Sequence, residues 1–399
     1  MTGIRGTNKD DYCSANMTHN NKIVLLFLSL SLMSSCSPPR GDKMDSCHYV
    51  PLRTTEEVTD LTPFVSNLDL IKVGAGDDGL PGISKILFSE PLVLLSGGVV
   101  YSASSDFKDI TRVGNVGRGP GEYLSIKDIA INSLGDEIWC MDVLNSVLRY
   151  DLMSLGYLGR IDFQKNAREY ARAMIPQKNN SVALYTPNPD GNIPQGNKTF
   201  YCISIFNSSG REVDQKLSWT QYNVMAGFSN PVSVVGQGKY VLSPESSNVA
   251  YVFDDEGVNQ LIVFDFGSKW IPSNYLNPRN GDPIKKIGDI FEMDCFKLIS
   301  SIYFPGDNLY FHAYGKDSSS WNFYLSKDGS HGIRWRSIGS SSPPISAIAS
   351  EGEYLYFPYE DYGLVEKEED PLKQYVIQTL GSPENKGSSY LIKIKLNVD

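Results

Sequence analysis

The stretch IKDIAINSLGDEIWCMDVLNSVLRYDLMSLGYLGRIDF, residues 126–163, indicates the fold of this chain. Residues 126–132 alternate apolar and polar side chains, a Ser-Leu-Gly-Asp turn follows, and 137–142 is again extended. After a second turn, 147–151 and 156–163 supply two more extended segments. Extended segments separated by turn residues predict four antiparallel strands. A unit of four strands and about 40 residues has the size of one β-propeller blade.

The same rhythm of short extended segments and turns recurs along the chain. Five further units are predicted within residues 83–113, 171–219, 231–264, 298–338 and 345–396. The last unit lacks a strand, which residues 67–73 (NLDLIKV) can supply, and pairing the two ends of the chain removes exposed sheet edges. The sequence therefore predicts an all-β, six-bladed β-propeller of four-stranded antiparallel blades closed by an N-terminal strand. A β-sandwich is the rival architecture, but six such units exceed its usual size. Short helices are expected only at 166–173 and 283–296.

The N-terminal region has the pattern of an export signal. A polar stretch ends in Lys22, residues 23–33 (IVLLFLSLSLM) form an apolar run, and two serines precede Cys36. The run is shorter than the about 20 residues that a membrane-spanning helix needs. The Ser-Ser-Cys sequence resembles the lipobox of bacterial lipoproteins, which implies that Cys36 becomes the acylated N-terminus. We favour Met17 over Met1 as the initiator, because the residues before Met17 would otherwise precede the signal to no purpose.

This interpretation divides the chain into a signal region, a tether with a lead-in, and a propeller, at residues 1–36, 37–66 and 67–399. The stretch after Cys36 (SPPRGDKMDS) cannot bury a core and is typical of a flexible tether. We expect an exported protein that its lipid anchors to the cell envelope, at the outer membrane, on its periplasmic or surface face. An uncleaved anchor helix and an ordinary signal peptide with an incidental cysteine are the alternatives.

The most distinctive segment is GRGPGEY, residues 117–123, whose three glycines and one proline predict a tight loop. The segment is similar to the GxGPGE(Y/F) signature of the six-bladed β-propeller lipoproteins of Gram-negative bacteria, which are related to NHL and TolB-like propellers. The resemblance covers 67–396 in blade rhythm, although 384–391 (ENKGSSYL) departs from the family's final strand. It implies a loop that leads from the outer strand of one blade to the inner strand of the next. Most members have no assigned activity, so the resemblance implies a fold and no reaction.

Two interpretations of this loop stay open. In the structural one, the glycines let one blade pass close to the next. In the functional one, Arg118 and Glu122 are polar contacts of a ligand and Tyr123 offers a face for stacking. The segment is not a phosphate-binding P-loop, because the Lys-Ser/Thr ending is missing.

Side chains of the predicted inner strand raise the question of a central ion. Asp128 and Asn132 lie on one face of this strand, where carboxylate and amide oxygens could bind calcium. Alternatively, both line a solvated channel, and Asp128 is then a ligand contact. Apart from this calcium alternative we predict no metal and no cofactor. His48, His312 and His331 show no convergent spacing, and His312 is expected to be an ordinary strand residue.

Charge and composition narrow the function. The formal net charge is −10 and no basic stripe is present, so we do not expect nucleic-acid binding. The 23 Tyr and 17 Phe residues favour strands and provide flat apolar faces for sugars or peptides. We therefore expect a propeller that binds an envelope protein, peptide or glycan without catalysis. A metal-dependent six-bladed lyase or hydrolase and a structural subunit of an envelope complex are the alternatives.

Overall fold

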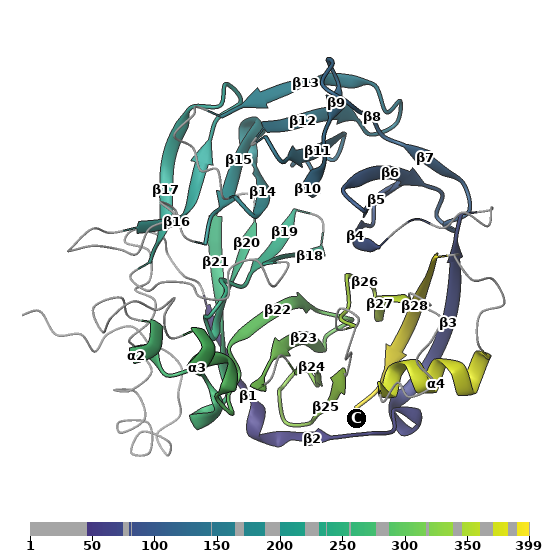
Figure 1. Ribbon diagram of the computed structural model, residues 1–399, viewed down its shortest axis with the longest axis vertical. Coiled ribbons are helices and arrows are strands. Elements are labelled where there is room, and N and C mark those ends of the chain that lie inside the picture. The colour runs from purple at the N-terminus through teal and green to yellow at the C-terminus, as the bar shows by residue number, and fades with distance from the viewer. Residues whose placement is uncertain are drawn as a thin grey trace, which may run out of the picture.

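Six β-sheets form a ring around a common axis in the computed structural model, which confirms the all-β, six-bladed propeller (Figure 1). The structure describes residues 46–74, 80, 82–144, 146–163, 171–187, 200–219, 231–236, 238–254, 257–276, 287–316, 319–337, 345–359, 370–381 and 389–398. Each blade contains four antiparallel strands that run in order from the axis to the rim.

The blades are numbered in chain order from the first complete sheet. Blade I holds β4 (Ile83–Leu87), β5 (Leu92–Ser96), β6 (Val99–Ala103) and β7 (Ile110–Arg112). Blade II holds β10 (Ile126–Ile131), β11 (Glu137–Asp142), β12 (Ser146–Asp151) and β13 (Tyr157–Asp162). Blade III holds β14 (Ala173–Gln177), β15 (Ser181–Tyr185), β16 (Phe200–Phe206) and β17 (Glu212–Trp219). Blade IV holds β18 (Val232–Gly236), β19 (Lys239–Leu242), β20 (Val249–Asp254) and β21 (Gly257–Asp265). Blade V holds β22 (Leu298–Tyr303), β23 (Leu309–Tyr314), β24 (Ser320–Leu325) and β25 (Gly332–Ser337). Blade VI holds β26 (Ala349–Glu351), β27 (Tyr354–Tyr359), β28 (Ser389–Leu396) and β3 (Val65–Val73).

Burial within a blade explains the sequence pattern of its strands. All five residues of β5 (LVLLS) are buried, and in β11 (EIWCMD) only Glu137 is partly exposed. Both faces of a second strand are covered, because the neighbouring blades pack against it. The outer strand β13 is mostly exposed, with Ile161 as its buried residue. Continuous apolar runs therefore mark the middle strands, and polar residues mark the rim.

The predicted closure of the ring by the N-terminal strand is confirmed. The strand β3 pairs antiparallel with β28 from Val73 opposite Ser389 to Val65 opposite Leu396. Leu68 and Leu70 pack against the core that blades V and VI share. The two ends of the chain thus complete one sheet, and blade VI has no unpaired outer position on β28.

The lead-in is more ordered than the sequence indicated, and part of residues 37–66 belongs to the propeller. The strand β1 (Ser46–Pro51) pairs in parallel with β21, and β2 (Thr55–Glu57) pairs in parallel with β25. Blades IV and V therefore have five strands, and the chain follows the rim before it enters blade VI (Figure 1). The physical reason is that the outer strands β21 and β25 offer unpaired backbone groups, which an extended segment of almost any composition can satisfy.

The inner strand of blade IV contacts the cores of other blades across the ring. Val234 packs against the apolar core of blades I and II, whereas its neighbour Val235 packs against the core of blades V and VI. The hydroxyl group of Tyr240 on β19 also reaches across to the carbonyl of Ile131 in blade II, at 3.3 Å. These contacts link blade IV to blades across the ring, although both valines stay partly exposed.

Helices occur in connections between strands. The helix α3 (Ile287–Glu292) lies within the predicted helix at 283–296, and α2 (Ser273–Leu276) precedes it. Of the predicted helix at 166–173, residues 166–170 lie outside the described residues, and Ala173 begins a strand.

A longer helix, α4 (Pro371–Leu380), was not predicted. The Asp370 side chain accepts the N–H groups of Leu372 and Lys373, and proline takes the first helical position. Leu372 and Val376 are buried in the core that blades V and VI share. The sequence contains the usual signals for the start of a helix here. Its apolar positions are too few, however, to distinguish a helical period from that of the surrounding strands.

The two faces of the ring carry connections of different length. The inner strands all run in one direction, so the links between blades and the links between second and third strands lie on the same face. We call this the long-loop face; its connections are 74–82, 97–98, 113–125, 143–145, 163–172, 186–199, 220–231, 243–248, 266–297, 315–319, 338–348 and 360–388. The opposite, short-turn face carries 88–91, 104–109, 132–136, 152–156, 178–180, 207–211, 237–238, 255–256, 304–308, 326–331 and 352–353. The longest connections therefore all join strand ends that lie on one side of the ring.

Candidate functional site

The glycine-rich loop on the long-loop face is braced from within. Two short parallel strands, β8 (Asn115–Val116) and β9 (Glu122–Tyr123), close its base. The Glu122 carboxylate accepts the N–H group of Gly119 at 2.6 Å. A Cβ atom at Gly117 would lie 2.1 Å from the same carboxylate, so glycine is needed for this carboxylate to fold back. Glu122 therefore holds the loop together, whereas Arg118 at its tip is exposed.

Tyr123 anchors this loop to blade I. The side chain is buried, with 1% of its surface exposed. Its hydroxyl group donates to the carbonyl of Val113 at 2.9 Å and accepts the N–H group of Val100 at 3.2 Å. Burial raises the pKa of Tyr123 to about 12. The expected stacking face is thus not available to a ligand in this structure, because the ring fills the seam between blades I and II.

A close approach of backbone and side chain fixes the end of the loop. Gly121 has φ +73°, and a Cβ atom there would lie 2.9 Å from the ring of Tyr157. The carbonyl of Gly121 accepts the hydroxyl group of Tyr150 at 3.0 Å. These contacts support the structural interpretation, in which glycine permits close packing at the blade seam.

Asp128 is the centre of a buried polar contact between three blades. Its Oδ1 atom accepts the ammonium group of Lys85 from blade I at 2.6 Å, and both side chains are 4% exposed. The same atom accepts the N–H group of Ile129, and Oδ2 accepts the N–H group of Met174 from blade III at 2.8 Å. The carboxylate is therefore neither solvated nor directed at an open channel; it joins the inner strands of three blades.

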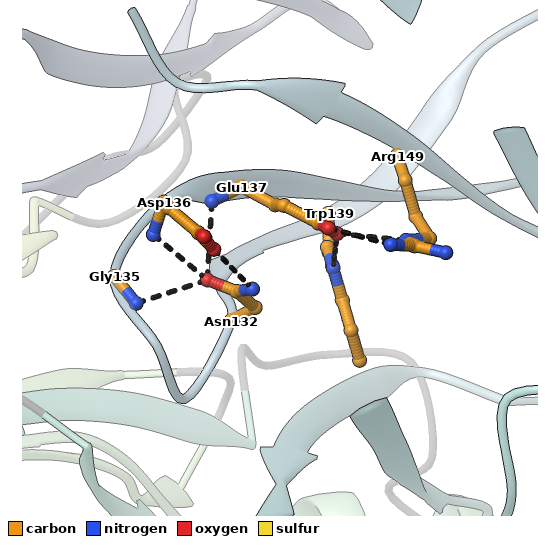
Figure 2. Close-up of polar contacts among 6 residues, drawn as sticks. All are labelled: Asn132, Gly135, Asp136, Glu137, Trp139 and Arg149. Atoms are coloured by element: carbon orange, nitrogen blue, oxygen red, sulfur yellow. Dashed lines mark hydrogen bonds and ion pairs between the residues drawn. The ribbon is translucent and has the colours of Figure 1, made fainter. Parts of the chain in front are cut away.

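Asn132 does not share this environment with Asp128. It begins the turn after β10, where its Oδ1 atom accepts the N–H groups of Gly135, Asp136 and Glu137 (Figure 2). Its Nδ2 atom donates to the Asp136 carboxylate at 2.7 Å. The side chain thus shapes a turn on the short-turn face, and the two residues do not form the predicted pair of ion ligands.

A second polar group in Figure 2 stabilises the surface of blade II. The Glu137 carboxylate accepts Nε1–H of Trp139 at 2.8 Å and Nε–H of Arg149 at 2.7 Å. The hydrogen bond from Arg149 holds the pKa of Glu137 below its ordinary value. This ion pair joins the neighbouring strands β11 and β12.

The histidines are separate. His312 on β23 is buried between the hydroxyl groups of Ser300 and Ser320, and burial lowers its pKa to about 3. His331 is exposed in the turn after Lys327. Within the described part of the chain, no three His, Cys, Asp or Glu side chains are grouped closely enough to hold a metal ion.

The structure brings together two cations that the sequence analysis did not single out. Lys127 is the extra residue of a β-bulge, because the register of β10 with β11 shifts between Ile126 and Asp128. Arg172 stands just before β14, where its N–H group donates to the carbonyl of Tyr185 at 2.8 Å. Burial, with the positive charge of Arg172, holds the pKa of Lys127 below its ordinary value. A bulge is a feature of strand pairing, so no local pattern in the sequence predicts it; the lysine beside Asp128 is the one visible sign.

Apolar side chains lie beside these cations on the long-loop face. We call the four exposed residues Val116, Leu124, Val143 and Leu144 the blade II apolar patch; they are 52%, 38%, 39% and 61% exposed. The N–H group of Val143 donates to the carbonyl of Ser125 at 3.0 Å, so the turn and the glycine-rich loop are in contact.

The proposed lipid site, Cys36, and the apolar run before it lie outside the described residues. Among the residues that the structure does describe, no helix is both long and apolar enough to span a membrane.

Comparison with known proteins supports the architecture. The family model DUF5128, 6-bladed beta-propeller, matches residues 100–326. No curated protein matches the chain. A crystal structure of a Bacteroides fragilis protein inferred to be exported is similar with a TM-score of 0.64 and 14% identity, over 88% of this chain and 99% of that chain.

Two WD40 structures are more distant. The RRP9 WD40 repeats match with a TM-score of 0.39 and 10% identity, over 83% of this chain and 98% of that chain. The Neurospora crassa Pan2 WD40 domain gives 0.38 and 10%, over 78% of this chain and 74% of that chain. At 14% identity the similarity to the Bacteroides fragilis protein concerns the fold alone. The TM-scores of the two WD40 structures are too low to support any conclusion about this chain.

Proposed function

This chain belongs to the DUF5128 family of six-bladed β-propellers, and on this premise we propose that it is an exported lipoprotein whose long-loop face binds a partner at the cell envelope. The partner is a protein, peptide or glycan. Export is supported by the signal-like run at residues 23–33 and by the structural relative from Bacteroides fragilis, which is inferred to be exported. Cys36 would then hold the propeller at the membrane through a short tether.

The observation that carries the binding proposal is the one-sided distribution of the connections. The links 266–297 and 360–388 leave the same face as the glycine-rich loop, whereas short turns cover the other face. Loops that a rigid scaffold presents side by side are the usual place of recognition.

The main alternative is a metal-dependent lyase or hydrolase with its ion on the axis. The carboxylate first considered for that role, Asp128, already accepts the Lys85 ammonium group and the Met174 N–H group. A calcium ion there would have to displace a buried ion pair. This observation favours binding over the metal-dependent alternative at this carboxylate.

Site-specific photo-crosslinking in cells tests the binding surface. A benzophenone amino acid at Leu124 or Leu144 probes the long-loop face, and the matched controls Leu134 and Met153 are 73% and 75% exposed in short turns of the same blade. We expect discrete adducts, identified by mass spectrometry, from the first pair only. Equal adducts from both faces, or from the short-turn face alone, would contradict the proposal.

The anchor has its own test. Cys36→Ala should abolish acylation and move the protein from the membrane fraction to the soluble fraction, because a thiol is needed to carry the lipid. Intact-mass measurement of the purified protein gives the N-terminus and any lipid. An unmodified N-terminus upstream of residue 36 would show that Cys36 is not the lipid site.

A further inference from the structure

Four apolar side chains are exposed where the long-loop face meets blade II. The blade II apolar patch combines residues of the glycine-rich loop with the turn between β11 and β12. Exposure of valine and leucine side chains to water is unfavourable, and these residues lie in adjacent loops. Patches of exposed apolar residues are typical of interaction sites. The patch is therefore a candidate contact surface.

The patch is held in place by hydrogen bonds. The Asp142 carboxylate accepts the N–H group of Leu144 at 2.9 Å and that of Ser146 at 3.0 Å, which fixes the turn. The carbonyl of Ser125 accepts the N–H group of Val143, which joins this turn to the loop. A surface that is already ordered loses little conformational entropy when a partner binds.

Positive charge lies at the axial side of the patch. The hydrogen bond from the Met174 N–H group to Asp128 locks β14 of blade III against β10. Lys127 precedes Asp128 by one residue and Arg172 precedes Met174 by two, so both cations stand at the long-loop end of this seam. The buried Asp142 carboxylate also acts on Lys127, and Arg172 is the more exposed cation of the two.

We propose that the blade II apolar patch, with Lys127 and Arg172, docks an extended peptide segment of a partner protein that carries both apolar and carboxylate side chains. This inference rests on the proposed function and names the partner's chemistry. The apolar side chains of the segment cover the patch, and its carboxylates pair with the two cations. The charge complementarity argues for an acidic segment, because Arg and Lys at a partly dehydrated surface favour a carboxylate partner.

Peptide selection on the full-length protein tests this inference directly. The probe is a phage-displayed library of random dodecapeptides, panned on the immobilised protein. We expect selected peptides to be enriched in Asp or Glu together with Leu, Ile or Phe. Affinities of the synthetic peptides are then measured by fluorescence polarisation.

Variants locate the site. Leu144→Ser, Lys127→Gln and Arg172→Gln should each weaken the selected peptides by roughly tenfold or more, since truncating a central contact has that effect. The controls Leu134→Ser and Met153→Ser remove equally exposed apolar side chains from the short-turn face and should leave affinity unchanged. All five variants should keep the parent melting temperature, and Leu144→Thr serves as a milder second variant if Leu144→Ser does not.

Three outcomes would overturn the inference. Selected peptides that lack acidic residues, or whose affinity ignores Lys127 and Arg172, contradict the stated chemistry. Failure to enrich any peptide excludes a linear peptide partner. Co-sedimentation with phosphatidylethanolamine–phosphatidylglycerol vesicles that Leu144→Ser abolishes would assign the patch to the membrane. The crosslinking test asks only whether a partner contacts the long-loop face. Adducts from Leu124 or Leu144 together with any of these three outcomes would therefore retain the proposed function and reject the acidic peptide.

Discussion

Lys85 Nζ lies 2.6 Å from Asp128 Oδ1, in a buried ion pair that joins the inner strands of blades I and II. Asp128 also accepts the N–H group of Met174, so one carboxylate ties three consecutive blades. Asp128 is the residue that the sequence suggested as a possible calcium ligand. In the structure its carboxylate is paired with Lys85 instead.

Removing the cation of this pair should destabilise the ring. Lys85→Met leaves the Asp128 carboxylate buried without its counter-ion, and we expect a loss of about 3–5 kcal/mol in the free energy of unfolding. Lys85→Met combined with Asp128→Asn should recover much of this loss, because the amide is neutral and its oxygen still accepts the Met174 N–H group. Urea denaturation of Lys85→Met, Asp128→Asn and the double variant, each compared with the parent, measures the coupling. A single variant as stable as the parent would show that the pair does not hold the blades.

Chelation should leave the melting temperature unchanged. Both oxygens of Asp128 already accept hydrogen bonds, from Lys85, Ile129 and Met174. A calcium ion could therefore bind this carboxylate only by displacing one of these donors. Thermal unfolding after EDTA treatment, with and without added calcium, tests this expectation. A calcium-dependent rise that Asp128→Asn removes would restore the metal interpretation.

His312 should make stability depend on pH. Burial lowers its pKa to about 3 from an ordinary 6.5, so the folded protein keeps it neutral while the unfolded chain gains a proton. Its contribution is complete above pH 6.5 and declines as pH falls toward 3, with a slope of about 1.4 kcal/mol per pH unit.

Denaturation between pH 6.5 and 5 isolates this effect. The pKa of Glu137 is lowered below its ordinary 4.5, so the stability from its pair with Arg149 is lost only in more acidic solution. His312→Asn should flatten the profile, and the exposed His331→Gln should not. Identical slopes in the parent and His312→Asn would contradict the assignment.

Tyr123→Phe should weaken the seam between blades I and II without disturbing its shape. The change removes the hydroxyl group that bridges Val113 and Val100 and leaves a buried carbonyl and N–H group unsatisfied, at a cost of about 1–3 kcal/mol. The control is Tyr157→Phe, whose side chain is 40% exposed and should change stability little. If both variants cost the same, the hydroxyl group of Tyr123 is not the anchor.

Truncation from the N-terminus should have two stages. Removing the chain through Glu57 deletes β1 and β2, which only extend blades IV and V, and should lower the melting temperature while the ring stays closed. Removing it through Val73 also deletes β3, the fourth strand of blade VI, and the lost burial amounts to roughly several kcal/mol. Circular dichroism and gel filtration compare the two proteins. A monodisperse, cooperatively folding product of the longer deletion would refute ring closure by β3.

The glycine-rich loop illustrates how far sequence reasoning reached. Gly117 and Gly121 predicted a tight loop between blades, and the structure places it there. The same segment did not reveal that Tyr123 points inward, because alternation around a loop does not fix which side chain enters a seam. Arg118 and Glu122 looked alike as polar contacts, yet one is exposed and the other folds back onto Gly119.

The sequence by itself determined the blade rhythm, the number of blades and the closing role of β3, because strands and turns follow from the order of neighbouring residues. Only the tertiary structure decided that Asp128 pairs with Lys85, that β1 and β2 join the rim, and that Lys127 and Arg172 share one seam. Each of these contacts joins different strands or blades. Which residues meet in these contacts depends on how the sheets pack around the axis. The periodicity of a single strand does not contain that information.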